Sequence, residues 1–192
     1  MQPKLKKNLF GVIAIVIFLL AITVFENYFS EELMIKNIDA SAEEKSKTIT
    51  NNAISSSKEI LANSKSESEK LQNAINLFRG FYFSNAKSRP KYCLKYNVQI
   101  DSFVRAFEKE HSKEYAFMKK YEASNAPIPA KSYEKLNELL DKKIATEMNN
   151  TTKEHNLTIE EYCKTFQTNT NEYIEYMKIS KVLPEIYHLL NK

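Results

Sequence analysis

Apolar residues are distributed very unevenly along this chain of 192 residues. One uninterrupted apolar stretch, LFGVIAIVIFLLAITVF, runs from Leu9 to Phe25 and carries no charge. At about 1.5 Å per residue, a helix of this length spans roughly 26 Å, and the hydrocarbon core of a bilayer is about 30 Å thick. We therefore expect residues 9–25 to form a transmembrane anchor.

The charges that flank this stretch predict its orientation. Lys4, Lys6 and Lys7 precede it, whereas several glutamates follow it. Basic residues favour the cytoplasmic side of a membrane, so we expect residues 1–8 in the cytoplasm. The protein would then be a single-pass protein of the inner or plasma membrane, with residues 30–192 extracytoplasmic.

A cleaved signal peptide is the alternative interpretation of the same stretch. The basic start fits, but the apolar stretch is longer than the usual 7–15 or so residues of a signal peptide. The best cleavage candidate, Ala21-Ile-Thr23, ends in a β-branched residue and is a poor match to a small-residue cleavage site. Cleavage would leave a secreted or periplasmic protein.

Beyond the anchor, apolar residues recur at the spacing of amphipathic helices. The chain has only 2 glycines and lacks Asn-Gly and Asp-Gly, the dipeptides typical of tight hairpins. This pattern predicts an all-α fold, with a bundle of about four helices plus a short C-terminal helix. We divide it into a juxtamembrane segment with a long first helix, 26–80, and a helical domain packed with part of that helix, 81–192.

Local signals mark where these helices begin and end. Ser41-x-x-Glu44 and Thr158-x-x-Glu161 match capping boxes, and Gly80 is a natural C-terminal stop. The residues after Gly80 therefore read as a connector, up to about residue 100. The expected helices cover residues 41–80, 101–121, 132–148, 158–177 and 180–190.

The charge balance argues against one class of function. The chain has 28 basic and 24 acidic residues, and three of the lysines precede the apolar stretch. Lysines and glutamates alternate through the remainder, without the basic block that nucleic-acid-binding proteins present. We therefore expect no nucleic acid as a partner. The expected partners are the membrane and another envelope protein.

The two cysteines, Cys93 and Cys163, suggest a disulfide. Cysteines in an extracytoplasmic compartment tend to pair, whereas cytoplasmic thiols stay reduced. The alternative is a pair of free, buried thiols that behave as small apolar side chains. Given the expected topology, we predict that the two cysteines are bonded.

Metal ligation is the sharpest chemical possibility in the sequence. Two Glu-x-x-His motifs, Glu108/His111 and Glu185/His188, place a carboxylate and an imidazole on one helix face. Ferritin-like di-iron bundles use two such motifs together with further glutamates. However, His111 lies on an otherwise apolar stripe, as a buried structural histidine would, and Pro184 puts the second motif in a short helix. A di-metal bundle is kept as an alternative, and we expect no cofactor.

An aromatic cluster straddles the expected end of the first helix. It consists of Phe78, Phe81, Tyr82 and Phe83, on both sides of Gly80. Exposed aromatic clusters mark partner surfaces. The cluster is therefore either a partner surface or a piece of core beneath the connector.

No catalytic residues are expected. Neither cysteine lies in a recognisable nucleophile motif, and the glycines are too few for a phosphate-binding loop. The sequence predicts a membrane-anchored extracytoplasmic protein with a non-catalytic binding or scaffolding role in the cell envelope. A small-ligand-binding or sensory bundle that acts with a membrane partner is the main alternative.

Overall fold

The computed structural model describes residues 54–55, 57–125 and 129–191. The expected cytoplasmic segment, the apolar stretch and the capping box at Ser41 lie outside these residues. Within the described part, none of the helices has the length and apolar character needed to cross a membrane. The described elements are all helical, so the all-α prediction is confirmed.

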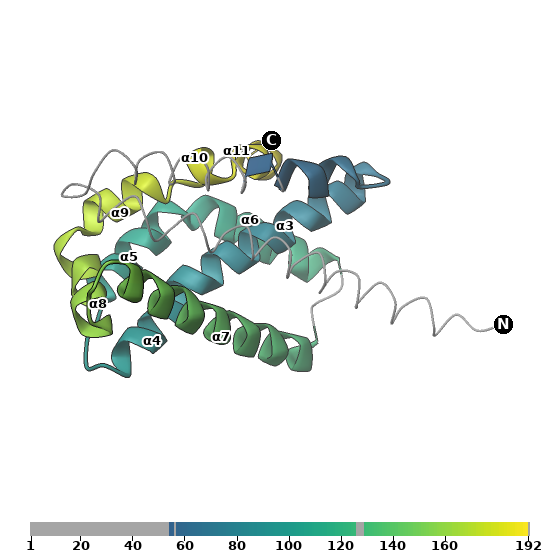
Figure 1. Ribbon diagram of the computed structural model, residues 1–192. Helices are drawn as coiled ribbons and strands as arrows, with labels where there is room; N and C mark the ends of the chain where they lie inside the picture. The colour runs from purple at the N-terminus through teal and green to yellow at the C-terminus, as the bar shows by residue number, and fades with distance from the viewer. Residues whose placement is uncertain (1–53, 56, 126–128, 192) are drawn as a thin grey trace.

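The helical segments follow one another along the chain with short connections (Figure 1). In order they are α3 (Glu67–Phe83), the π-helix η2 (Ser84–Ser88), α4 (Arg89–Leu94), α5 (Asp101–Glu110), α6 (Ser112–Ser124), α7 (Ala130–Glu154), α8 (Ile159–Thr168), α9 (Thr170–Tyr176), α10 (Ile179–Val182) and α11 (Pro184–Leu190).

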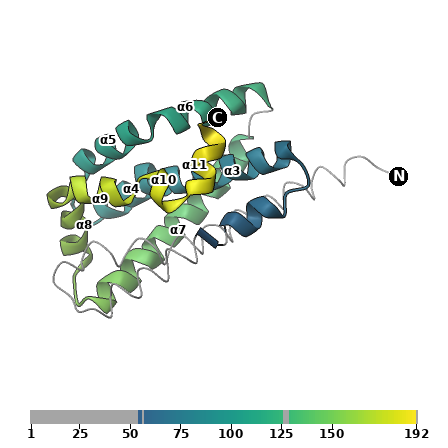
Figure 2. The ribbon, with the colours of Figure 1, turned by 90° about the horizontal axis from the view of Figure 1, so that it is seen from above.

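Helix α3 forms the centre of the bundle. It contacts α6, α7 and α11, and α5 packs against α9. Figure 1 shows α9, α10 and α11 along the top edge and the long α7 crossing below, and Figure 2 shows α5 and α6 along a third side. The bundle therefore wraps three groups of helices around α3.

The start of α3 is set by a serine cap that the sequence analysis did not single out. The Ser66 side chain accepts a hydrogen bond from the backbone N–H of Glu69 at 3.1 Å, and the Glu69 carboxylate accepts one from the N–H of Lys65 at 2.8 Å. Residues 63–66 are not helical. The prediction of one continuous helix up to Gly80 is therefore wrong, because this cap begins a new helix.

The helix does not end at Gly80, which also corrects the expected connector. Gly80 is buried inside α3, and no glycine in the described part has a positive φ. The chain continues as helix through η2 and α4 to Leu94. The physical reason is burial, because the residues on both sides of Gly80 face the core and gain more from helical packing than from a turn.

The π-helix η2 joins α3 to α4 without a break. The N–H of Arg89 bonds to the carbonyl of Ser84, five residues back, which is the π-helical spacing. Asn85 is fully buried and donates from Nδ2 to the carbonyl of Phe81 at 3.0 Å. This side-chain bond adds a second donor to a carbonyl that also accepts from the N–H of Ser84, where the regular ladder changes.

The later helices begin where expected but end or break elsewhere. Helix α5 begins at Asp101, and the Thr158 capping box is present at α8, with Glu161 N–H to Thr158 Oγ1 at 3.1 Å. The expected helix 101–121 breaks at His111, and 158–177 breaks at Asn169. The additional breaks divide the expected four-helix pattern into shorter pieces.

Helix α7 and the C-terminal segment also differ from their expected bounds. Helix α7 runs on to Glu154, through the polar stretch expected to end it, because Thr151 and Thr152 are buried against the bundle. The expected helix 180–190 is interrupted at Leu183, and Pro184 begins α11. Proline at the start of a helix loses no intrahelical hydrogen bond.

The aromatic cluster predicted near Gly80 belongs to the core. Phe78, Phe81, Tyr82 and Phe83 are all at most 5% exposed. Phe81 lies 5.2 Å from Phe107, ring centre to ring centre. The interpretation of the cluster as an exposed partner surface is therefore wrong, because α5, α6 and α7 cover it.

Candidate functional site

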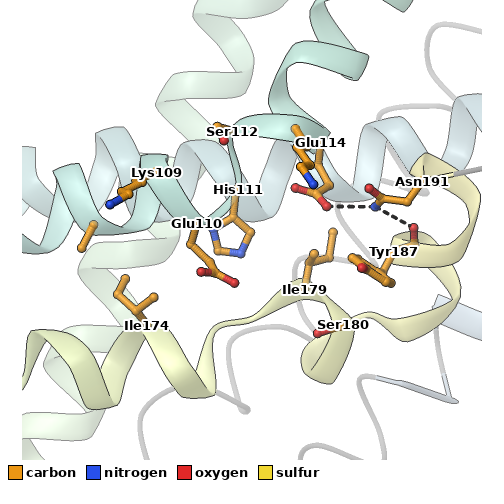
Figure 3. Close-up of a pocket in the computed structure, with 12 residues that line it drawn as sticks. Lys109, Glu110, His111, Ser112, Glu114, Ile174, Ile179, Ser180, Tyr187 and Asn191 are labelled. Carbon is orange, nitrogen blue, oxygen red and sulfur yellow. Dashed lines mark hydrogen bonds between the residues drawn. The ribbon is translucent and has the colours of Figure 1, made fainter.

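The described part of the chain has a cavity of about 530 Å³ beside the junction of α5 and α6 (Figure 3). One wall comes from the end of α5 and the start of α6, and the other from α9, α10 and α11. Its lining residues are Ala106, Lys109, Glu110, His111, Ser112, Lys113, Glu114, Ile174, Ile179, Ser180, Tyr187 and Asn191. This volume is within the usual range for small-molecule sites, about 300–1,000 Å³.

His111 holds the two walls together. It is only 1% exposed, and its ring centre lies 4.3 Å from that of Phe107, with the two rings tilted by 36°. Its Nδ1 lies 2.9 Å from the carbonyl oxygen of Phe107, one turn earlier, and its Nε2 lies 3.0 Å from that of Met177 at the end of α9. The histidine therefore bridges the α5–α6 junction to the α9–α10 junction.

Burial dominates the titration of His111. Desolvation lowers the pKa of this imidazole below its usual value of 6.5, although the two carbonyls and the nearby Glu114 and Glu110 carboxylates oppose the shift. One ring nitrogen donates to a carbonyl in the neutral form, and both donate in the charged form. Because both nitrogens face carbonyl oxygens, His111 serves here as a structural bridge.

Glu114 is the most buried carboxylate of the cavity. Its side chain comes from the first turn of α6, and the residue is only 5% exposed. Its Oε1 accepts a hydrogen bond from Nδ2 of Asn191 at 2.9 Å, and the same nitrogen donates to the carbonyl of Tyr187 at 3.0 Å. Asn191 caps α11 and thereby ties the end of the chain to α6 (Figure 3).

The remaining lining combines apolar walls with charged groups. Ile174, Ile179 and Tyr187 provide apolar surface on the α9–α11 side. Glu110 is exposed, and Figure 3 shows its carboxylate beside the His111 ring, whereas the Glu114 carboxylate points toward Asn191. In the described part of the structure neither glutamate forms an ion pair.

The structure does not join the two Glu-x-x-His motifs into one site. Glu108 is exposed on α5. The Oε1 atom of Glu185 lies 3.7 Å from Nζ of Lys58, and Glu185 is not beside His111. His188 is exposed and contacts Tyr187. Among the residues that the structure describes, no group of three or more His, Cys, Asp and Glu side chains could hold a metal ion.

The predicted disulfide is confirmed. Cys93 in α4 and Cys163 in α8 are bonded, with their Cα atoms 5.6 Å apart, and neither residue is exposed. The bond links segments 70 residues apart in the sequence. It therefore fixes the C-terminal end of the continuous helical segment α3–η2–α4, the rod, to the C-terminal half of the bundle.

The sequence did not predict the cavity or most of the residues that line it. His111 was singled out both as part of a metal motif and as a buried structural histidine, and the second interpretation is confirmed. Glu114 and Asn191 were not singled out. The Glu114–Asn191 hydrogen bond joins residues 77 apart. No periodicity or motif in the sequence points to such a pairing.

Comparisons with protein-family models, with curated proteins and with solved structures find no match.

Proposed function

We propose that this protein is a membrane-anchored extracytoplasmic bundle with a non-catalytic binding role. The observation that carries the proposal is the buried Cys93–Cys163 disulfide. Disulfides form and persist in oxidising compartments and are rare in the cytosol. The apolar stretch Leu9–Phe25, preceded by three lysines, supplies the anchor in this proposal.

Binding rather than catalysis is supported by the chemistry around the cavity. A general base must reach the proton that it removes. His111, the natural candidate, has each ring nitrogen within 3.0 Å of a backbone carbonyl oxygen. The cavity instead offers apolar walls and fixed polar groups, as ligand-binding sites do. This favours the ligand-binding bundle over pure scaffolding, and partnership with another envelope protein stays a prediction.

Thiol labelling of the full-length chain in its native membrane tests this assignment. Native membranes are denatured with and without a reductant, the thiols are alkylated, and the chain is then weighed by mass spectrometry. We expect no alkylation of the unreduced chain and two adducts after reduction and denaturation. The chain should sediment with membranes and need detergent for extraction.

Two results would contradict the proposal. One is alkylation of both cysteines in denatured but unreduced protein from freshly lysed cells. The other is recovery of full-length chain in the soluble fraction without detergent. The same mass separates an uncleaved anchor from a cleaved signal, because cleavage removes the N-terminal apolar stretch. The C93S/C163S variant is the control for labelling at other residues.

A further inference from the structure

We propose that Asn156, in the turn between α7 and α8, is an N-glycosylation site. The inference rests on the extracytoplasmic placement proposed above, because N-linked sugars are attached to chains that have left the cytoplasm. Three features carry it: an acceptor triplet, a turn that holds this triplet at the surface, and a side-chain amide that the fold leaves unused.

The chain contains three Asn-x-Ser/Thr triplets, the sequence that N-glycosylation requires. They start at Asn149, Asn150 and Asn156 and lie close together in the sequence. The first two are part of α7, which ends at Glu154, and the third follows that end. The fold therefore places the triplets in different surroundings and determines which of them an enzyme can reach.

Helix α7 blocks the first two triplets. Their hydroxyl residues, Thr151 and Thr152, are only 2% and 5% exposed. The side-chain nitrogen of Asn149 also donates to the hydroxyl of Tyr92 at 3.0 Å, which ties α7 to α4. A sugar on this nitrogen would break that contact, and an enzyme could reach neither threonine hydroxyl in the folded chain.

The third triplet lies in the turn that ends α7. Asn156 has a φ of 52°, the left-handed conformation that asparagine adopts more readily than most residues. The N–H of Leu157 bonds to the carbonyl of Thr152 at 2.9 Å, which is the closing bond of a Schellman motif. Figure 2 shows this turn at the edge of the bundle, between α7 and α8.

The turn uses only the backbone of Asn156. The residue is exposed, and within the described part of the chain its side-chain amide forms no hydrogen bond. Thr158, which completes the triplet, is also exposed, at the N-terminal cap of α8. Turn and cap therefore give both residues a structural role and still leave the amide nitrogen at the surface, available for a covalent bond.

The residues two positions before the candidate acceptors show the same contrast. Glu147 precedes Asn149 and is buried, 2.9 Å from Arg89. Glu154 precedes Asn156 and is exposed. A transferase that reads an acidic residue at this position would therefore find its full acceptor sequence, Glu-x-Asn-x-Thr, accessible only at Asn156 among the three triplets.

The modification is a group transfer from a lipid-linked oligosaccharide pyrophosphate. The side-chain nitrogen of Asn156 attacks the anomeric carbon of the first sugar, and a C–N bond forms. The bond between that carbon and the pyrophosphate oxygen breaks, the lipid pyrophosphate leaves, and the amide releases one proton. No oxidant or reductant is needed. This chain is only the acceptor, and a separate membrane enzyme transfers the sugar.

Tryptic digestion of the full-length chain from its native membrane tests the inference, because lysines separate the triplets. After reduction of the disulfide, the peptide Glu154–Lys164 contains Asn156 alone, whereas Ile144–Lys153 contains both of the other acceptors. We expect tandem mass spectrometry to find Glu154–Lys164 heavier by one oligosaccharide, attached to Asn156. The peptide Ile144–Lys153 should have its unmodified mass.

Matched variants connect the modification to the triplet. N156D keeps a side chain that tolerates the left-handed conformation but lacks the amide nitrogen. T158N keeps a residue type that caps helices but lacks the hydroxyl. We expect both variants to lose the sugar completely, while T158S, which keeps the hydroxyl, and N149Q/N150Q, which keeps the third triplet, retain it. An intact disulfide in each variant shows that it has folded.

Several outcomes would overturn the inference. These are an unmodified Glu154–Lys164 peptide in the wild type, a sugar on Ile144–Lys153, or a modification that persists in N156D or T158N. A chain that is membrane-bound and disulfide-bonded but carries no sugar would refute the site and leave the proposed topology intact. Free thiols in a chain without sugar would refute both.

Discussion

Arg89 donates two hydrogen bonds from one guanidinium nitrogen to the carboxylate of Glu147, at 2.9 and 3.2 Å, inside the core of the bundle. Both residues are almost fully buried. Arg89 also donates from Nε to Oδ1 of Asn85 at 3.2 Å, and its guanidinium lies 5.0 Å from the ring centre of Phe166. One ion pair thus joins α4 and α7 at the π-helix.

Breaking this pair should be far more costly than removing it. Either R89M or E147L leaves one buried group without its partner, and we expect the free energy of unfolding to fall by about 3–5 kcal/mol. The double variant R89M/E147L replaces both groups by apolar ones and should recover most of that loss. Urea denaturation of the three variants measures this. Additive losses in the double variant would show that the two residues act independently.

Reduction of the disulfide should destabilise the bundle strongly. The bond spans 70 residues, and on the chain-entropy model its loss costs about 4 kcal/mol. Because both sulfurs are buried, a reductant should act fully only when denaturant is present. The measurement is the urea midpoint with and without reductant, and the C93S/C163S variant should match the reduced protein. An unchanged midpoint would refute the predicted contribution.

Stability should fall as the pH is lowered through the usual pKa of histidine. His111 has a folded-state pKa below its usual value of 6.5, mainly because it is buried. Below pH 6.5 the unfolded chain therefore binds a proton that the folded chain does not. The contribution is fully present above pH 6.5 and is lost by up to about 1.4 kcal/mol per pH unit as the pH falls toward the folded-state pKa.

Urea denaturation at a series of pH values between 8 and 5 or so tests this linkage. The wild type should lose stability across the range, and H111Q should lose much less, whatever its absolute stability. The control H188Q alters an exposed histidine and should keep the wild-type slope. An equal slope in H111Q and the wild type would assign the titration to another group.

Glu122 joins three helices through a buried hydrogen-bonded cluster. It accepts from Nε of Arg79 of α3 at 3.1 Å, from Lys119 of α6 at 2.9 Å and from the hydroxyl of Tyr133 of α7 at 2.7 Å. Burial by itself raises the pKa of this carboxyl, but the three donors together hold it below its usual 4.5. The ionised form of Glu122 is therefore the one that the fold stabilises.

Two substitutions separate the parts of this cluster. Y133F removes one neutral donor and should lower the free energy of unfolding by about 1 kcal/mol. E122A leaves a buried arginine without its partner and should cost about 3 kcal/mol or more. The stability from Glu122 is present above pH 4.5 and is lost as the pH falls below it. Similar losses from both variants, measured by urea denaturation, would contradict this ranking.

The sequence predicted those features that depend on local chemistry. The helix start at Thr158 follows from a cap and its partner three residues later, and the structure contains both hydrogen bonds. The start of α5 at Asp101 was also predicted from the sequence. The Cys93–Cys163 bond was predictable because only two cysteines exist. In each case the deciding residues are few and unambiguous.

The features that were missed depend on residues far apart in the sequence. Gly80 looks like a helix stop, and only the packing of its neighbours shows that the helix continues. Arg89 sits in a stretch that looks like a connector, and its burial requires Glu147, 58 residues later. The break at His111 depends on the carbonyl of Met177, 66 residues later. Local patterns carry no information about such partners.

The π-helix Ser84–Ser88 has a consequence for anyone who engineers this rod. Each residue turns an α-helix by about 100°, and a π turn holds more than the usual number of residues. A helical wheel drawn straight through from Leu77 to Cys93 will assign positions to the wrong side. Deleting one residue of the bulge should restore an α turn and leave Cys93 on its present face, whereas deleting one residue of α3 would rotate everything downstream by about 100° and aim the Cys93 sulfur away from its partner.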